Sequence, residues 1–181
     1  MKLQLTTLTA LVLLGSANLA SANCPEVLDF EMRKLRSKDT VQLCEAYAGQ
    51  PLLVINTASH CGFTPQFKGL EALYKEYQGR GLHVAGFPSN SFKQEANTEE
   101  KTAEICYINY GVTFDMYSEI DVTGSDAHPM FAQLAEAEGA PRWNFTKSLI
   151  DADGNVVAKF GSRTAPEDED FRAAIEAVLT N

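Results

Sequence analysis

The chain is poor in basic residues. Its 181 residues hold 15 Lys and Arg against 24 Asp and Glu, which gives a formal net charge of -9. Surfaces that bind nucleic acid or anionic membranes need the opposite balance. We therefore expect neither of those partners. The composition, with 45% hydrophobic and 22% charged residues, is that of an ordinary globular protein, and the length suits one domain.

Histidine is also scarce, and no cluster of cysteine and histidine has the spacing of a zinc site. We therefore expect no metal ion and no other cofactor. The three histidines are scattered, and surface or core roles suit them best: His60, His83 and His128. A C-x-x-C motif is missing as well, because position 64, three residues after Cys61, is Thr. Thiol–disulfide oxidoreductases of the thioredoxin type need that pair.

No apolar run at the start of the chain is long enough to span a bilayer. Residues 5–14 are mostly apolar, Lys2 precedes them, and Ala-Ser-Ala at 20–22 is a small-x-small cleavage site. This pattern predicts a secretory signal peptide, residues 1–22, and one mature domain, residues 23–181. The mature protein would be periplasmic or secreted, without stable membrane insertion. An uncleaved anchor and lipid attachment at Cys24 are the alternatives.

The chain has only four cysteines: Cys24, Cys44, Cys61 and Cys106. An oxidising compartment permits disulfides, and four cysteines allow three pairings among which sequence alone does not choose. Since Cys24 and Cys44 both precede the first buried strand, we predict that they form a structural bridge. Such a loop would contribute roughly 3 kcal/mol in the chain-entropy model. Cys61 and Cys106 then remain for chemistry.

One cysteine lies where a strand gives way to a helix. The apolar run at 52–55 leads into Cys61, and glycine, proline and a helical pattern follow. The first N–H groups of a helix have no internal partner and its dipole is positive there, so a thiolate is stabilised. The pattern predicts a reactive Cys61. We expect Thr64 to cap the helix, with Pro65 at its first position.

The remaining periodicity predicts alternating helices and strands with no internal repeat. Helical patterns fall at 65–78, 98–110, 129–137 and from 166 onward, strands at 82–87, 145–150 and 156–160, and an extended stretch at 113–122. A strand–helix–strand unit followed by a final strand–strand–helix unit predicts an α/β domain. Its central mixed β-sheet would be flanked by helices.

Three motifs occur in order along the chain. Residues 56–64 read Asn-Thr-Ala-Ser-His-Cys-Gly-Phe-Thr, residues 87–92 read Phe-Pro-Ser-Asn-Ser-Phe before a Gln-Glu pair at 94–95, and residues 143–147 read Trp-Asn-Phe-Thr-Lys. Together with Asp-Gly at 153–154, they resemble the motifs of the glutathione peroxidase family. The resemblance implies a thioredoxin-like fold and a thiol-dependent peroxidase that reduces hydrogen peroxide and organic hydroperoxides.

The resemblance implies a catalytic group made of Cys61, Gln94, Trp143 and Asn144. A cysteine thiolate attacks one peroxide oxygen and becomes a sulfenic acid, which expels hydroxide or alkoxide. The amides and the indole would donate hydrogen bonds to the developing charge. The family commonly carries more residues before its Gln, whereas only Lys93 separates Gln94 from the second motif. We therefore expect the Gln94 loop to be reshaped.

Some members of that family resolve the sulfenic acid with a second cysteine in the helix after the Gln motif, and Cys106 lies there. Such members are recycled by thioredoxin-like proteins rather than by glutathione. The segment at 122–143 is short, which implies a monomer with an open active-site face. A buried helix cysteine is the alternative for Cys106. For the whole chain, the alternatives are a thioredoxin-type thiol–disulfide oxidoreductase and a redox sensor.

Overall fold

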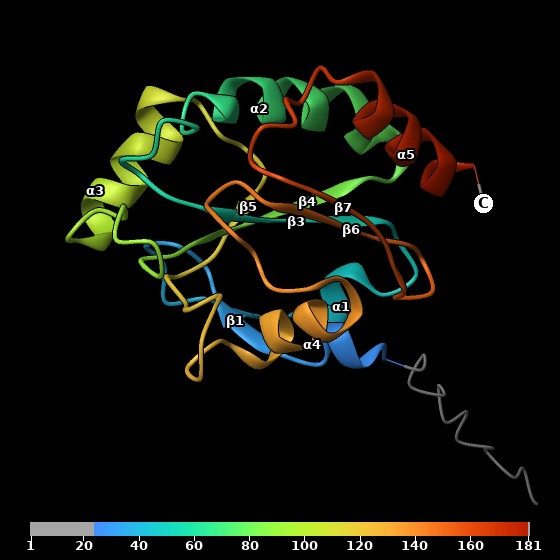
Figure 1. The fold of residues 1–181 in the computed structure, drawn as a ribbon, viewed down its shortest axis with the longest axis horizontal. Helices are drawn as coiled ribbons and strands as arrows, with labels where there is room; N and C mark the ends of the chain where they lie inside the picture. The colour runs from blue at the N-terminus through green and yellow to red at the C-terminus, as the bar shows by residue number, and fades with distance from the viewer. Residues whose placement is uncertain (1–23, 181) are drawn as a thin grey trace, which may run out of the picture.

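The computed structural model describes residues 24–180, and the predicted signal peptide lies outside the described residues (Figure 1). A five-stranded sheet runs through the middle of the molecule in the order β5-β4-β3-β6-β7. Its strands are β3 (Leu52–Thr57), β4 (His83–Pro88), β5 (Asp115–Met116), β6 (Lys147–Ile150) and β7 (Val156–Phe160). The β3–β4 and β4–β5 pairs are parallel, whereas β3–β6 and β6–β7 are antiparallel. The predicted mixed sheet is confirmed.

Helices cover both faces of this sheet (Figure 1). One face carries α2 (Gln66–Tyr77) and α5 (Glu169–Leu179), and the other carries α1 (Leu43–Tyr47) and α4 (Pro129–Glu138). On the second face lies a small hairpin of β1 (Glu31–Arg33) and β2 (Thr40–Gln42). The remaining elements are η1 (Glu26–Leu28), η2 (Gln78–Arg80), α3 (Glu99–Ala103) and the π-helical segment η3 (Glu104–Asn109). None of the helices in residues 24–180 has the length and apolar character needed to cross a bilayer.

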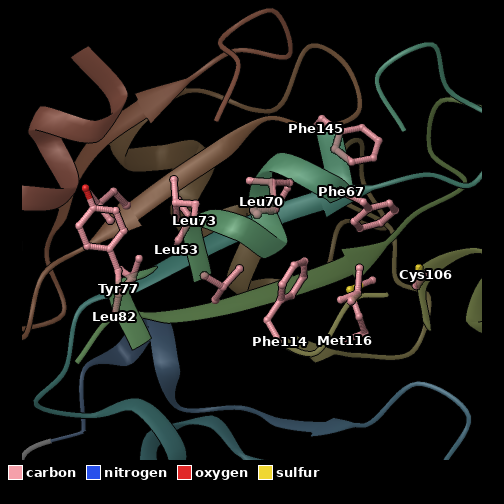
Figure 2. Packing of buried hydrophobic residues seen from close by; sticks show 14 of the residues in the cluster. Leu53, Phe67, Leu70, Leu73, Tyr77, Leu82, Cys106, Phe114, Met116 and Phe145 are labelled. Atoms are coloured by element: carbon pink, nitrogen blue, oxygen red, sulfur yellow. The ribbon is translucent and has the colours of Figure 1, made fainter. Parts of the chain in front are cut away.

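The central strand β3 explains how two cores form. Its side chains alternate between the faces, so Leu53 and Ile55 join one apolar cluster while Leu52 and Val54 join the other. Because both faces are covered, the strand is a continuous apolar run rather than an alternating one. Figure 2 shows the first cluster, in which Leu70 and its neighbours on α2 pack onto the sheet.

Several predicted boundaries differ from those observed. The stretch at 113–122 is mostly irregular and contributes only the two-residue β5. The last helix begins at Glu169 rather than at Pro166, because the Asp168 carboxylate accepts hydrogen bonds from the N–H groups of Asp170 and Phe171. The helix predicted at 98–110 is present, with Thr98 as its cap, but its second half is π-helical.

The N-terminal segment was not assigned any element from the sequence. Its pieces are only three to five residues long, which is too short for a periodic pattern to show. In the structure a disulfide joins Cys24 to Cys44, with Cα atoms 5.7 Å apart. This separation lies inside the usual range for bridges. The bond fixes the start of the described chain to α1.

Candidate active site

Cys61 lies in the turn between β3 and α2, and its side chain is almost buried at 6% exposure. The backbone N–H of Phe63 donates a hydrogen bond to Cys61 Sγ over 3.4 Å. A donor aimed at the sulfur stabilises the charged form of a thiol more than the neutral form. The turn therefore holds one thiol in a setting suited to a nucleophile.

Thr64 does not cap helix α2, and that prediction is wrong. Pro65 occupies the N-cap position, and no side chain caps the helix. Thr64 Oγ1 instead donates to Ala58 O (2.8 Å) and accepts from Cys61 N (3.1 Å), while Thr64 N donates to Cys61 O. Thr64 therefore belongs to the tight turn that precedes α2. Its hydroxyl joins the two ends of the turn and fixes the Cys61 backbone.

Two of the predicted catalytic amides meet directly. Asn144 Nδ2 donates to Gln94 Oε1 over 2.9 Å, although the two residues are 50 positions apart. The backbone carbonyl of Gln94 also accepts a hydrogen bond from the N–H of His60, the residue before Cys61. These contacts place the Gln94 loop against the Cys61 turn.

The loop before Gln94 is tightened by an unusual backbone. Lys93 has a φ of 57°, in the left-handed region, and its N–H donates to Asn90 O over 2.8 Å. Few residues other than glycine adopt such a φ. The chain therefore turns sharply at Lys93, in the loop where the short spacing before Gln94 predicts an altered conformation.

Trp143 and Asn144 are neighbours with opposite exposure. Trp143 is 41% exposed and lies against Phe92, with ring centroids 5.3 Å apart. Asn144 is fully buried, and its Oδ1 has no hydrogen-bond partner in the described part of the chain. A buried acceptor without a partner is costly and calls for an explanation. Asn144 Oδ1 is thus a buried acceptor left unpaired next to the Gln94 loop.

A groove of about 710 Å³ opens beside Trp143, between Phe63 and residues 161–164. Arg142 and Arg163 line it, and neither forms an ion pair within residues 24–180. The groove is therefore positively charged, although the chain as a whole is acidic.

Lys147 lies buried behind the groove. Its Nζ donates to Gln66 Oε1 (2.6 Å) and to Thr164 O (2.7 Å), and no carboxylate among residues 24–180 pairs with its charge. Burial lowers the pKa of the Lys147 ammonium to about 8, because desolvation disfavours the charged form. This lysine belongs to the third motif, directly after the residues that form the site.

A buried carboxylate, which the motifs do not predict, lies beside the site. Glu95 Oε1 accepts hydrogen bonds from Ser59 Oγ, Thr102 Oγ1 (2.8 Å) and Ala96 N (2.7 Å). Glu95 therefore links the Cys61 turn and the Gln94 loop to helix α3. Its only signal in the sequence is its place after Gln94 in the second motif. A glutamate in a predicted polar loop gives no indication that it is buried.

Cys106 does not join this polar network. It is a free, buried thiol in η3 and belongs to the same apolar cluster as Cys61, which is also free. Figure 2 shows it at one end of that cluster. Burial raises the pKa of the Cys106 thiol to about 12, and the charge of Glu95 adds to the rise. In this conformation Cys106 is held as an unreactive thiol.

The histidines and acidic residues form no metal site in the part of the chain that the structure describes. There, no group of three or more His, Cys, Asp or Glu side chains lies close enough to hold an ion. His60 is exposed, His83 bonds to Gln50, and the His128 ring accepts a hydrogen bond from Met130 N at the start of α4.

Comparison with known proteins agrees with the motifs. The family model described as glutathione peroxidase matches residues 27–135. A glutathione peroxidase of Lactococcus lactis subsp. cremoris is 47% identical over 146 residues, covering 77% of this chain and 92% of the relative. A glutathione peroxidase-like peroxiredoxin 2 of Saccharomyces cerevisiae is 45% identical over 129 residues, covering 67% of this chain and 80% of that protein.

Solved structures give the same fold. The crystal structure described as Trgpx in apo form superposes with a TM-score of 0.68 at 32% identity, covering 86% of this chain and 95% of that one. The structure described as MTB dsbF in its mixed oxidized and reduced forms superposes with a TM-score of 0.59 at 14% identity, covering 83% of this chain and 96% of that one. The latter likeness shows only the fold. The predicted thioredoxin-like architecture is confirmed.

Proposed function

Since the chain belongs to the glutathione peroxidase family and is a peroxidase of that kind, we propose that Cys61 reduces hydrogen peroxide and organic hydroperoxides. One observation carries this proposal. The Asn144–Gln94 hydrogen bond and the His60–Gln94 backbone bond bring two predicted catalytic amides to the turn that holds the nucleophile.

The chemistry proceeds by transfer of one oxygen atom. The Cys61 thiolate attacks the terminal oxygen of the hydroperoxide, the O–O bond breaks, and a sulfenic acid forms while alkoxide or hydroxide departs. The departing oxygen gains negative charge and takes up a proton. The N–H groups of Gln94, Asn144 and Trp143 would donate hydrogen bonds to that charge. Phe63 N, which donates to Cys61 Sγ, supports the thiolate before the attack.

A thioredoxin-like dithiol protein is the reductant that we propose. Cys106 supports this choice, because it places a second thiol on the element that follows the Gln94 loop. The Cys106 thiol would attack the sulfenic sulfur, releasing water and leaving a Cys61–Cys106 disulfide for the donor to reduce. The short segment at 122–143 supports a monomer, which leaves the groove beside Trp143 open to such a donor.

A thiol–disulfide oxidoreductase is less well supported. Such an enzyme needs a second sulfur three residues after the first, where this chain has Thr64. The Thr64 hydroxyl is committed to Ala58 O and Cys61 N. A redox sensor would also be oxidised by peroxide at Cys61, but it would not reduce peroxide in repeated cycles.

The proposal is tested by following peroxide consumption by residues 23–181, with glutathione and a thioredoxin–thioredoxin reductase pair supplied in separate assays. We expect sustained turnover with thioredoxin and much slower turnover with glutathione. Hydrogen peroxide and cumene hydroperoxide serve as the two substrates. Turnover with glutathione alone would overturn the choice of reductant, and stoichiometric oxidation without turnover under either donor would indicate a sensor.

We also propose that the protein is exported after removal of residues 1–22 and that Cys24–Cys44 is a structural disulfide in the mature protein. Their bond in the structure and the predicted signal peptide support this. Peptide mapping without reductant is expected to find Cys24 linked to Cys44 before any peroxide is added. A Cys24–Cys61 peptide would contradict the assignment. Loss of the bridge in Cys44→Ser is expected to lower the unfolding free energy by roughly 3 kcal/mol.

A further inference from the structure

Asn56 is an unexpected residue near the end of the buried central strand. It follows the apolar run at 52–55 in β3, pairs with Phe87 of β4, and is fully buried. An amide removed from water destabilises the folded state unless its polar atoms find partners. An apolar residue would suit the strand better. The partners of this amide therefore indicate its role.

Every polar group of Asn56 bonds to the segment that carries Trp143 and Asn144. The side-chain Nδ2 donates to Trp143 O over 3.2 Å, and Oδ1 accepts from Thr146 N over 3.1 Å. The backbone carbonyl of Asn56 accepts from Phe145 N over 2.6 Å, and its N–H donates to Thr146 O over 3.3 Å. These four bonds hold both ends of one turn.

That turn needs holding because its backbone is strained. Phe145, directly after Asn144, has a φ of 60°, although it is not a glycine. A residue kept in this region costs on the order of 1–3 kcal/mol and persists only when its surroundings fix it. The Phe145 ring is buried against Phe67 of α2, with centroids 5.2 Å apart. The ring fixes one side of the turn, and Asn56 fixes its backbone.

We propose that Asn56 is a positioning residue that holds the strained turn at residues 143–146 and so orients the Trp143 indole and the Asn144 amide toward Cys61. Asn56 lies near the end of β3, five residues before Cys61 in the turn that follows, so the strand that leads to the nucleophile also holds the turn at 143–146. The inference deepens the proposed function and rests on it.

The test measures two properties separately, the rate of Cys61 oxidation and the conformation of the turn at residues 143–146. The rate is taken from competition with a second peroxidase for hydrogen peroxide. The turn is followed by tryptophan emission and its quenching by acrylamide, because Trp143 is the chain's single tryptophan. The variants are Asn56→Ala and the isosteric Asn56→Asp, which keeps an acceptor for Thr146 N but loses the donor to Trp143 O.

Two further variants serve as controls. Val54→Ala truncates a buried residue of the same strand in the opposite apolar cluster, so it lowers stability without touching the turn. Thr146→Val removes a second donor to Trp143 O, the Thr146 hydroxyl at 3.0 Å. We expect Asn56→Ala and Asn56→Asp to slow Cys61 oxidation by about 10- to 100-fold, with altered Trp143 emission. Thr146→Val should cause a smaller loss, and Val54→Ala should lower the melting temperature only.

Wild-type Trp143 emission in both Asn56 variants would overturn the positioning role, whatever happens to activity. So would a rate loss no larger than that of Val54→Ala at a matched fall in melting temperature. If Asn56→Ala does not fold, Asn56→Asp decides the question alone. Failure of the proposed function is recognised differently, as a Cys61→Ser variant that consumes peroxide as fast as the wild type.

Discussion

Replacement of Cys61 by serine is expected to lower the rate of peroxide reduction by about a thousandfold or more, the largest effect of any single change. Serine has nearly the shape of cysteine, and Phe63 N can donate to its oxygen as it donates to Cys61 Sγ. The hydroxyl, however, is far less acidic than a thiol and forms no sulfenic acid. Chemistry is lost while the turn between β3 and α2 is kept.

The measurement is peroxide consumption at fixed thioredoxin, together with thermal unfolding of the same preparations. Lys68→Ala is a suitable surface control, because Lys68 is exposed on α2 close to the turn. We expect it to leave both activity and melting temperature unchanged. Undiminished turnover in Cys61→Ser would end the assignment of Cys61 as the nucleophile. Loss of activity together with loss of the folded transition would contradict the expectation that serine preserves the turn.

The parts of the fold that were predictable are those with a strong periodic signal. Strand β3 and helix α2 follow directly from the apolar run at 52–55 and the helical spacing after Pro65. Boundaries were less predictable, since they depend on which side chain bonds to which N–H group. Asp168, two residues after Pro166, caps α5, and Thr64 bonds within the Cys61 turn instead of capping α2.

For the candidate site, motifs indicated the residue types but not the contacts that hold them. The chain order of Gln94 and Asn144 does not reveal that their amides meet. The roles of Asn56 and Glu95 were also hidden, because their partners are backbone atoms and hydroxyls far along the chain. Such partners become visible only once the sheet register is known. The motifs therefore predicted which side chains take part in the chemistry. The hydrogen bonds that hold those side chains became visible only in the tertiary structure.

The fold by itself does not decide between peroxidase and thiol–disulfide exchange. The chain superposes on MTB dsbF with a TM-score of 0.59 and on Trgpx with a TM-score of 0.68, so all three share one fold. The difference lies in what surrounds one sulfur. Here Thr64 closes the turn where a second cysteine would stand. The backbone of Gln94 bonds to His60 in the same turn, and its side chain bonds to Asn144.

Treatment of the reduced mature protein with one equivalent of hydrogen peroxide is expected to link Cys61 to Cys106. A disulfide needs Cα atoms within roughly 7 Å, and the two thiols stand on different elements and are both free in the structure. We expect the segment that carries Cys106 to open when the two sulfurs meet. Its π-helical form is rare and often marks functional segments. Ile108 on the same segment is 77% exposed, so few apolar contacts hold its outer side.

Opening also changes the chemistry of the thiol. Burial raises the pKa of Cys106 to about 12, so exposure to water returns it toward its ordinary value and makes thiolate available. Cys106→Ser is expected to keep the first oxidation of Cys61 but to lose thioredoxin-dependent turnover by on the order of a hundredfold. Mass spectrometry of peptides from both proteins tests this. A persistent sulfenic or sulfinic acid at Cys61 of the wild type, with Cys106 free, would instead establish a one-cysteine peroxidase that is reduced directly by an external thiol.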